Sequence, residues 1–458
     1  MIEDSRFESN GLPNSGTGGA VESTNRVGTG VLLRSEFVDN NGWSGGAIYL
    51  GGSTRIESSL FESNGAEFRG GAIRSLGSLD ITDSDFTLNS AGNRGGAIEA
   101  FQGFGTGAAT MTIDDCRFDF NFASQAGAID SRVSALIVDS SFTTNWGTAV
   151  VLTRESDVVD SFFMSNSSAQ SGGAIRGPVN ITGTAFSSNF ASDGGGAVAG
   201  VMAISASSFV ANTTNGSGGA VAGAEAIEDS VFTGNGSTLR GTAAVDFRRG
   251  SRLTATGNFS LNSSFMQGGA LSGFDLLEES TVAGNRAAGV PANLVLCDGS
   301  RVVRCRVAVG PVPPGMAGPP PLGLAVQVEN GAVAVIEDSL IEGGVQVREF
   351  GSLDLVGCTV VGQDPDVPAL DVERGGLAVL ESSILAGDTV ARASSGSGLL
   401  LLSSLVEGGL GEEQIASNVL VDVVGILLTF DPGFVDADGP DNNPLTFDDN
   451  DLRPRHAS

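Results

Sequence analysis

A nine-residue pattern, I-x-D-S-x-F-x-x-N, recurs along this chain and constrains its fold more than any other feature. A polar link follows each copy, and then a tetrad of the type G-G-A-I. The Phe/Asn pairs are Phe7/Asn10, Phe37/Asn40, Phe61/Asn64, Phe86/Asn89, Phe118/Asn121, Phe142/Asn145, Phe163/Asn166, Phe186/Asn189, Phe209/Asn212, Phe232/Asn235 and Phe259/Asn262. Self-similarity at a fixed period indicates a repeat architecture in which each unit packs on its neighbours.

After these units an aliphatic residue replaces Phe. The aliphatic positions are predicted to be Val282, Val307, Ile341, Val360, Ile384 and Leu405. From Phe7 to Leu405 the pattern gives 17 units in 398 residues, so that one unit takes about 25 residues. A helix-pair repeat would be longer and would not contain 67 glycines.

The spacing inside one unit determines its local shape. Ile and Phe of I-x-D-S-x-F cannot both point inward along one flat strand, so the chain must bend near Asp-Ser. Each unit is then a coil of short strands, and successive coils stack in parallel. The sequence therefore predicts an all-β protein, a single-stranded right-handed parallel β-helix of about 17 coils. We expect Phe and Ile inside, an Asn ladder at one corner, and glycine pairs where the backbone turns sharply.

The pattern divides the chain into three regions. Residues 1–290 are expected to form regular coils with Phe and Asn ladders, and residues 291–410 to continue them with aliphatic residues. A Pro-rich stretch at 310–323 cannot be a strand and is expected to protrude as a stiff loop. Residues 411–458 form an acidic C-terminal segment.

The repeats resemble those of known secreted proteins. G-G-A-I with F-x-x-N, over residues 1 to about 285, resembles the repeats of the chlamydial polymorphic outer membrane proteins, a family of autotransporter adhesins. The segment from Asp431 to Pro454 resembles the end motif of secreted β-helix proteins of environmental bacteria. These resemblances imply a pectin-lyase-like solenoid on a bacterial surface or outside the cell. Because Met1 leads into mid-repeat without an export signal, we expect a fragment of a longer exported protein.

The net charge of -29 restricts the partners of the chain. Nucleic acids and anionic membranes would be repelled, and no apolar run approaches the roughly 20 residues that span a bilayer. We therefore expect neither nucleic-acid binding nor membrane insertion by this chain. Cations are attracted instead, calcium above all. A surface glycan or a protein is the expected partner.

One column of carboxylates is a candidate metal site. Its members are expected at the same corner of four consecutive coils, and they are Asp83, Asp115, Asp139 and Asp160. At a spacing of about 5 Å, neighbouring charges repel by a little under 1 kcal/mol in water. Either each aspartate satisfies its own turn, or the column holds a metal or forms part of a lyase site. Arg117, Arg132 and Arg154 are near in sequence, but none is singled out as a base.

The acidic ending contains the second candidate metal site. Its D-x-D-G-x-D-N pattern resembles a calcium loop, with oxygen ligands on alternate residues and a glycine that permits the turn. The expected ligands are Asp436, Asp438, Asp441 and Asn443. The bidentate Glu that an EF-hand requires is missing, since position 447 is Phe. A calcium loop and an ordinary solvated acidic loop both remain open.

Enzyme chemistry has little support in the residues. The match of Gly42-Trp43-Ser44-Gly45-Gly46 to a nucleophile elbow is a repeat artefact, because the sole histidine is His456. Hydrolases of the pectin-lyase-like fold need a histidine and an Arg-x-Lys set, whereas its lyases use carboxylates for calcium with an Arg or Lys base. The aromatic residues are expected in the core, which leaves few for stacking on sugars. The sequence thus favours a non-enzymatic adhesin or structural stalk, with a calcium-dependent polysaccharide lyase as the alternative.

The cysteines are expected to be buried thiols. Three of them, Cys116, Cys305 and Cys358, fall in a column of small inward residues. The serines of that column are predicted to be Ser84, Ser140, Ser339 and Ser382. Cys305 and Cys358 are separated by a coil and lie too far apart for a disulfide. A bridge between Cys297 and Cys305 stays open.

Overall fold

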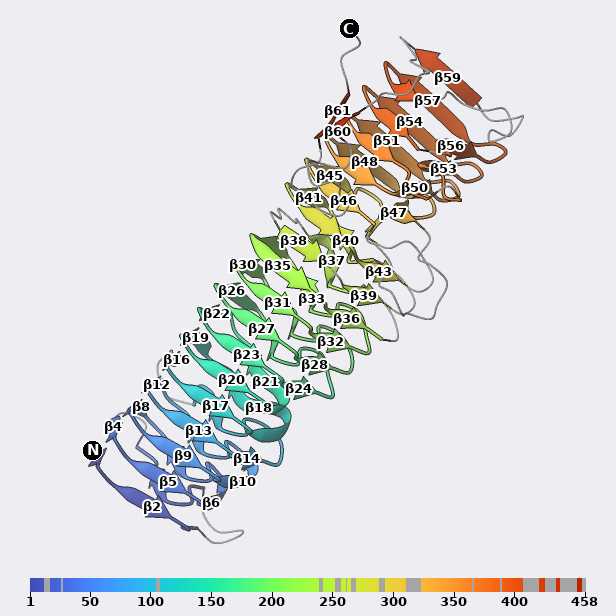
Figure 1. Ribbon diagram of the computed structural model, residues 1–458. Helices are drawn as coiled ribbons and strands as arrows, with labels where there is room; N and C mark the ends of the chain where they lie inside the picture. Colours follow the sequence, from blue (N-terminus) through green and yellow to red (C-terminus); the bar gives the residue numbers. More distant parts are fainter. Residues whose placement is uncertain are drawn as a thin grey trace, which may run out of the picture. The chain divides into compact units, whose positions relative to one another are not determined.

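The repeats fold into short strands stacked coil upon coil, as the computed structural model shows (Figure 1). The residues that the structure describes are 1–11, 17–25, 28–103, 108–238, 242–251, 257–260, 262–264, 269–287, 293–309, 323–364, 366–387, 389–406, 420–424, 434–436 and 451–454. These residues form an all-β parallel solenoid of about 14 turns with no helix. It follows that no helix among them could span a membrane. The predicted all-β, parallel solenoid is confirmed.

The coils form two compact units. Unit 1 comprises residues 1–240 and 244–246, and unit 2 comprises residues 241–243 and 247–458. β37 (Val245–Ser251) contains residues of both. The predicted loop at 310–323 lies outside the described residues apart from Gly323, and so does most of the segment 411–458.

Unit 1 contains three parallel sheets. Sheet 1 consists of β1 (Ile2–Glu3), β4 (Thr29–Leu33), β8 (Ser53–Glu57), β12 (Leu79–Thr82), β16 (Thr110–Asp114), β19 (Ser134–Val138), β22 (Ser156–Val159), β26 (Val179–Thr182), β30 (Ala203–Ser205) and β34 (Ala226–Glu228). Sheet 2 consists of β2 (Arg6–Glu8), β5 (Glu36–Val38), β9 (Leu60–Glu62), β13 (Asp85–Thr87), β17 (Arg117–Asp119), β20 (Ser141–Thr143), β23 (Phe162–Met164), β27 (Ala185–Ser187), β31 (Ser208–Val210) and β35 (Ser230–Thr233). Sheet 3 consists of β3 (Val21–Ser23), β6 (Asn41–Ser44), β7 (Ile48–Leu50), β10 (Gly65–Arg69), β11 (Ile73–Ser75), β14 (Ser90–Ala91), β15 (Ile98–Ala100), β18 (Phe122–Ser131), β21 (Trp146–Leu152), β24 (Ser167–Ser168), β25 (Ile175–Arg176), β28 (Phe190–Ala191), β29 (Val198–Ala199), β32 (Thr213–Thr214), β33 (Val221–Ala224) and β36 (Gly236–Ser237).

Unit 2 has the same kind of stacking. One column consists of β41 (Leu276–Glu278), β45 (Arg301–Val303), β48 (Val333–Glu337), β51 (Ser352–Val356), β54 (Leu377–Glu381), β57 (Gly398–Leu402) and β59 (Leu420–Val424). The second consists of β38 (Gly257–Ser260), β42 (Thr281–Ala283), β46 (Arg306–Ala308), β49 (Leu340–Glu342), β52 (Thr359–Val361), β55 (Ile384–Ala386) and β58 (Leu405–Val406). The third consists of β39 (Ser263–Ser264), β40 (Leu271–Phe274), β43 (Arg286–Ala287), β44 (Leu294–Leu296), β47 (Leu324–Val328), β50 (Gly344–Val347), β53 (Leu370–Val372) and β56 (Ala391–Ala393). The strands β60 (Phe434–Asp436) and β61 (Asp451–Pro454) pair with each other in antiparallel.

The coil corners are bends in left-handed backbone conformation. Asp83, between sheets 1 and 2, has a φ of 48°, and Leu88, between sheets 2 and 3, has a φ of 58°. The predicted bend at Asp-Ser is therefore confirmed. At the glycine pair Gly70 has a φ of 61°, and a Cβ on Gly71 would lie 1.9 Å from the carbonyl oxygen of Gly96. Only glycine fits there, because the backbones of successive coils touch.

The Phe column forms the core of unit 1, as predicted. Nine successive ring pairs from Phe7 to Phe232 stack with centroids 4.6–5.1 Å apart. From Phe37 onward these rings are at most 1% exposed. The spacing equals the distance between neighbouring strands of a sheet, so one ring fills one layer of the coil interior.

The predicted Asn ladder is also present. The backbone N–H and the Nδ2 amide of Asn121 both donate to Oδ1 of Asn145, each at 3.0 Å. Nδ2 of Asn145 donates in turn to Oδ1 of Asn166 and to the carbonyl of Phe118, each at 2.9 Å. The same arrangement recurs from coil to coil, and Asn145 is 1% exposed. Each buried amide therefore satisfies its own hydrogen bonds and those of its neighbour.

The small-residue column contains three of the cysteines. The N–H of Cys116 donates to Oγ of Ser140 at 3.1 Å, and its thiol donates to the carbonyl of Asp114 at 3.1 Å. All four cysteines are free. The expectation of buried thiols is confirmed for Cys116, Cys305 and Cys358, whereas Cys297 is only half-buried. The bridge between Cys297 and Cys305 that the sequence left open is not formed.

The predicted register is wrong at the end of unit 2. The buried residues there are Leu385 and Val406, whereas Ile384 and Leu405 are partly exposed. Ser383, and not Ser382, accepts the hydrogen bond from the N–H of Cys358, at 3.0 Å. Ser382 is the bend residue, with a φ of 50°. Two adjacent serines made both alignments possible, and the bend selected the second one.

Because Cys116, Cys305 and Cys358 are buried, their thiols make the stability of the fold depend on pH in the alkaline range. It raises the pKa of the Cys116 thiol to about 12 and the pKa of Cys305 and of Cys358 to about 11. An unfolded thiol has a pKa of about 8.5, so the folded state keeps a proton that the unfolded state loses. The stabilisation is complete below that value and is lost as pH rises toward the folded pKa.

We therefore expect the unfolding free energy of unit 1 to fall with rising pH above about 8.5. The Cys116 contribution amounts to as much as about 1.4 kcal/mol per pH unit. Cys116→Ser should remove this contribution, since serine occupies the same column in neighbouring coils. Equilibrium denaturation at several alkaline pH values measures it. An unchanged slope in the variant, or rapid labelling of Cys116 in the native protein, would contradict the burial of this thiol.

Candidate functional site

The four aspartates predicted at one corner lie in register on consecutive coils of unit 1. They follow β12, β16, β19 and β22, and they are Asp83, Asp115, Asp139 and Asp160. All four are exposed and have φ between 47° and 49°. Within the described ranges, no three His, Cys, Asp or Glu side chains form a group able to hold a metal ion. The column thus occupies a turn position, and calcium binding there stays a prediction.

The predicted calcium loop of the tail is mostly beyond the described part of the chain. Asp436 is the last residue of β60. Asp438, Asp441 and Asn443 lie outside the described residues. Calcium binding by this loop also stays a prediction.

Two fully buried carboxylates that the repeat pattern did not single out lie on sheet 3 of unit 1. Glu99 on β15 and Asp130 on β18 are neighbours in register, and both are 0% exposed. Arg74 on β11 precedes Glu99 in the same column, and Arg176 on β25 follows one coil after Val151. Charged residues therefore occupy this column on three adjacent coils, from Arg74 to Asp130, and again at Arg176 after Val151.

Arginines that precede and follow the glycine pair in sequence form ion pairs with these carboxylates. Glu99 pairs with Arg69 at 3.4 Å and with Arg74 at 2.8 Å. Asp130 pairs with Arg94 at 3.7 Å and with Arg132 at 3.6 Å. Arg69 ends β10 and Arg94 stands just before the next glycine pair, so that the turn brings their side chains to the second strand of sheet 3. We call Arg69, Arg74, Arg94, Arg132 and Arg176 the arginine cluster.

The ion pairs of Asp130 are too long to be hydrogen bonds. Neither oxygen of Asp130 has a hydrogen-bond partner, and the same holds for Oε1 of Glu99. Nε of Arg69 and Nε of Arg94 also donate to no acceptor. A buried polar atom without a partner is costly, so this cluster is held together by charge with its hydrogen bonds incomplete.

Burial acts on both kinds of charge in the cluster. It raises the pKa of Glu99, against the opposing effects of Arg74 and Arg69. It also raises the pKa of Asp130, against Arg132 and Arg94. Burial, and then the like charge of Arg94, lower the pKa of the Arg176 guanidinium. Arg94 and Arg176 therefore lie near enough to repel each other.

A signal for these residues was present in the sequence. The position directly after the tetrad carries Arg74, Glu99, Asp130 and Arg176 in different coils. Such a position faces away from the core, where charges are ordinary. Opposite charges in one column of adjacent coils would have indicated mutual pairing.

The aromatic residues of sheet 3 correct a second prediction. Trp43 and Trp146, the two tryptophans of the chain, are 47% and 62% exposed, and do not belong to the core. Trp43 stacks on Phe68 of the next coil with centroids 6.2 Å apart, and Phe122 lies 6.5 Å from Trp146. Strand alternation after the inward Asn turns Trp43, Phe122 and Trp146 outward. Phe68 points outward where the register shifts between Ala66 and Arg69. We call Trp43/Phe68 and Phe122/Trp146 the aromatic pairs.

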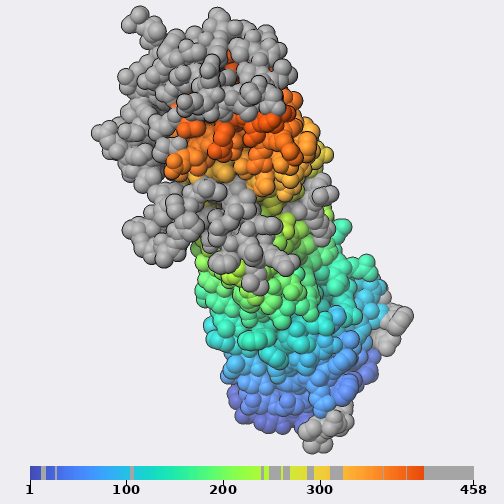
Figure 2. Space-filling model, turned by 90° about the vertical axis from the view of Figure 1, so that its right-hand side faces the viewer, coloured from blue at the N-terminus to red at the C-terminus, as the bar shows by residue number. Residues whose placement is uncertain are grey.

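The aromatic pairs and the arginine cluster share strands. β10 contains both Phe68 and Arg69, whose guanidinium lies 4.5 Å from the Phe68 ring centroid. β18 contains both Phe122 and Asp130. Figure 2 shows the side of the molecule on which β10, β18 and β24 lie in Figure 1. Unit 1 is coloured there from blue to green.

An open depression adjoins the cluster at Arg132. It measures about 550 Å³ and is polar. Its lining residues are Gln102, Ala109, Arg132, Val133, Ser134, Thr153, Arg154, Glu155 and Pro178. Its lining contains two arginines, Arg132 and Arg154, and one acidic residue, Glu155, so the positive character of the cluster extends into the depression.

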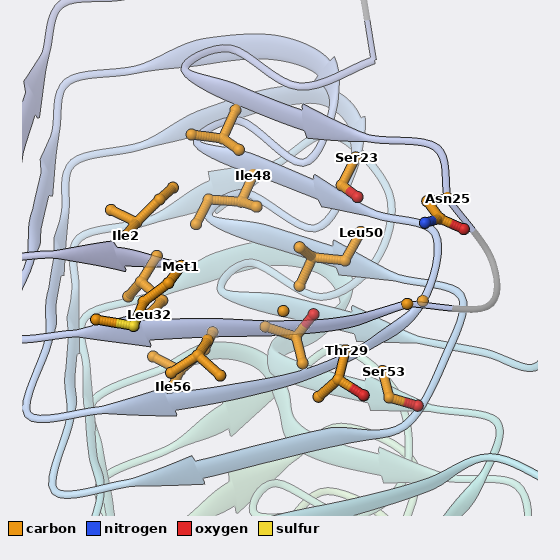
Figure 3. Close-up of a pocket in the computed structure, with 16 residues that line it drawn as sticks. Met1, Ile2, Ser23, Asn25, Thr29, Leu32, Ile48, Leu50, Ser53 and Ile56 are labelled. Atoms are coloured by element: carbon orange, nitrogen blue, oxygen red, sulfur yellow. The ribbon is translucent and has the colours of Figure 1, made fainter.

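A second cavity, of about 230 Å³, lies among the first coils of unit 1 (Figure 3). Leu32, Ile48 and Ile56 project into it together with Met1 and Ile2. No charged side chain lines it. Its walls combine apolar side chains with the hydroxyl and amide groups of Ser23, Asn25, Thr29, Ser53 and Thr54, and no titratable side chain is among them.

The candidate functional site is therefore the surface of sheet 3 formed by the aromatic pairs and the arginine cluster. Comparison of the chain with protein-family models and with curated proteins gives no match.

Proposed function

We propose that this protein is a non-enzymatic extracellular or cell-surface adhesin that binds a surface glycan through sheet 3 of unit 1. The observation that carries the proposal is the position of the two tryptophans. Both are exposed, both lie on sheet 3, and each lies beside a phenylalanine of an adjacent coil. Exposed aromatic groups of this kind mark interaction sites, and tryptophan is the residue most enriched among binding hot spots.

The stacked coils suit a chain-like ligand. One aromatic pair spans β6 and β10, and the other spans β18 and β21. Coils repeat at about 4.8 Å, so two platforms are offered along one direction of the stack. Leu88 and Phe120, which are 52% and 53% exposed at the corner beside the second pair, enlarge its apolar area. A polysaccharide laid along sheet 3 would contact both platforms.

The stacking of coil upon coil in each unit supports the role of a stalk. The resemblance of the repeats to those of autotransporter adhesins points to the same role in bacteria. We also propose that the coils wind to the right and number about 17, since each repeat unit from Phe7 to Leu405 contributes a strand to the column from β2 to β58.

Removing the second aromatic pair should abolish most glycan binding. We expect Phe122→Ala with Trp146→Ala to weaken binding on a glycan panel by roughly 30-fold or more, because the loss of even one hot-spot residue costs about 2 kcal/mol or more. Stability should change little, since both side chains point outward. Titration calorimetry measures the affinity.

Phe162→Ala is the matched control, because Phe162 is an exposed phenylalanine on sheet 2. It should bind as the parent does. If the parent and the double variant bind every glycan with equal affinity, sheet 3 is not the binding face.

A calcium-dependent polysaccharide lyase is the second candidate function. It is favoured by carboxylates and arginines gathered on one face, among them Arg176 with its lowered pKa. Against it stands the complete burial of Glu99 and Asp130, which keeps both from a substrate. Incubation with acidic polysaccharides and calcium separates the two functions. Ultraviolet absorbance of unsaturated uronate products would establish the lyase, and intact polymer recovered in complex with the protein would support the adhesin.

A further inference from the structure

The arginine cluster carries more positive charge than its carboxylates neutralise. Five guanidinium groups surround Glu99 and Asp130, as the ion pairs and the mutual effects on pKa show. Even with both carboxylates ionised, three positive charges are left over. This excess occurs in a chain of net charge -29, where most surfaces are negative. The cluster is thus a local site of attraction for anions.

Unused hydrogen-bond donors accompany this charge. Nε of Arg69 and of Arg94 have no acceptor. The side chain of Arg94 is 29% exposed and that of Arg69 is 24% exposed, so each reaches the surface while its base is enclosed. Arg176 is half-buried and donates to Gln170, and the like charge of Arg94 contributes to the lowering of its pKa. An oxyanion bridging Arg94 and Arg176 would accept hydrogen bonds from both and relieve their repulsion.

The buried carboxylates hold the arginines in place. Glu99 and Asp130 are 0% exposed, so a ligand on the surface does not touch them. The two carboxylate oxygens of Asp130 accept no hydrogen bond, so the guanidinium groups around it are held by charge and not by hydrogen bonds to this carboxylate. Guanidinium groups that the buried carboxylates already hold lose little side-chain freedom when an anion binds to them at the surface. Glu99 and Asp130 are therefore positioning residues.

Aromatic rings adjoin the cluster and narrow the choice of ligand. The Arg74 guanidinium lies between Tyr49 and Phe101, at 5.6 and 4.9 Å from their ring centroids, and Arg69 lies over Phe68. A ligand on this face would contact both aromatic rings and guanidinium groups, which lie within one or two coils of each other. A sugar ring that bears an acidic group presents both complementary surfaces.

We infer that the arginine cluster binds the oxyanions of an acidic glycan, either uronate carboxylates or sulfate esters, whose sugar rings lie on the aromatic pairs. This inference rests on the proposed function and specifies its ligand class. Arg94 and Arg176 contact the oxyanion. Arg132 extends the contact toward the depression beside Arg154.

The experiment compares three polymers as probes: polygalacturonate with carboxylates, dextran sulfate with sulfate esters, and neutral dextran. Titration calorimetry is run on the full chain and on Arg176→Gln, because Arg176 forms no ion pair within the described part of the chain and donates one side-chain hydrogen bond there, to Gln170. Arg94→Gln is the second variant, and an equilibrium melt verifies that each is folded. Arg55→Gln is the matched control, since Arg55 is an exposed arginine of sheet 1 that pairs with Glu57.

We expect at least one acidic polymer to bind, more weakly as salt increases, and the preferred polymer identifies the source of the oxyanion. Each of Arg176→Gln and Arg94→Gln should weaken that binding roughly tenfold, while Arg55→Gln should not. Neutral dextran binding as tightly as both acidic polymers, or Arg variants equal to Arg55→Gln, would overturn the inference and leave the proposed function standing. No binding of any of the three polymers, nor of any glycan on the panel, would overturn both.

Discussion

Phe186→Ala is expected to destabilise unit 1 by about 3–5 kcal/mol, the range found for large-to-small changes of buried aromatic residues. The ring of Phe186 lies between those of Phe163 and Phe209, with centroids 5.1 and 4.7 Å away. It is 1% exposed. Its removal loses the transfer free energy of the ring and leaves a cavity that neighbouring coils, fixed by their hydrogen bonds, cannot fill.

Equilibrium denaturation monitored by circular dichroism measures this loss. Val210→Ala is the control, because Val210 lies on the next coil of the same sheet but is 42% exposed. It should change the free energy of unfolding by less than about 0.5 kcal/mol. A loss below about 1 kcal/mol for Phe186→Ala would mean that the ring column does not hold the coils together.

Asn145→Ala is expected to cost roughly 3–6 kcal/mol, since it leaves several buried polar groups without partners at about 1–3 kcal/mol each. Oδ1 of Asn145 accepts from the backbone and the side chain of Asn121, and Nδ2 donates to Phe118 and Asn166. Alanine removes all four hydrogen bonds at a site where the amide is 1% exposed. Water cannot replace them inside the packed corner.

Asn41→Ala serves as the comparison. Asn41 is exposed and its side chain donates one hydrogen bond, to the carbonyl of Asp39 at 3.2 Å. Hydrogen exchange should also show faster opening of the coils around position 145 in Asn145→Ala. If the two variants lose the same stability, the ladder contributes nothing beyond an ordinary surface amide.

The inward columns could be predicted from the sequence because they are periodic. Phe and Asn recur at fixed offsets, so their burial and stacking followed from the repeat. The same periodicity failed at Ser382 and Ser383, where either serine fits the pattern and only the bend decides between them. A register shift of one residue there places Leu385 in the core, where the pattern predicted Ile384.

The candidate site was harder to predict because it consists of outward positions. Trp43 lies three residues after Asn40, whereas Trp146 directly follows Asn145, so no fixed offset in the repeat marks both tryptophans. Glu99 stands at a position that would be solvent-exposed in an isolated strand. It is buried only because Arg69 and Arg74 reach it from both sides of the glycine turn. The burial of Glu99 thus depends on side chains about 25–30 residues earlier in the chain, so a single repeat unit does not predict it.

The hydrogen bonds of the Asn ladder and of the sheets have a mechanical consequence if the protein acts as the adhesin proposed above. Within unit 1 they connect each coil to the next, along the direction of stacking. A pulling force in that direction loads the outermost coil first and peels it off while the coils behind stay folded. A detached coil of about 25 residues releases roughly 80 Å of chain. Unit 1 would thus yield by lengthening in steps, which dissipates tension before it reaches the bound ligand.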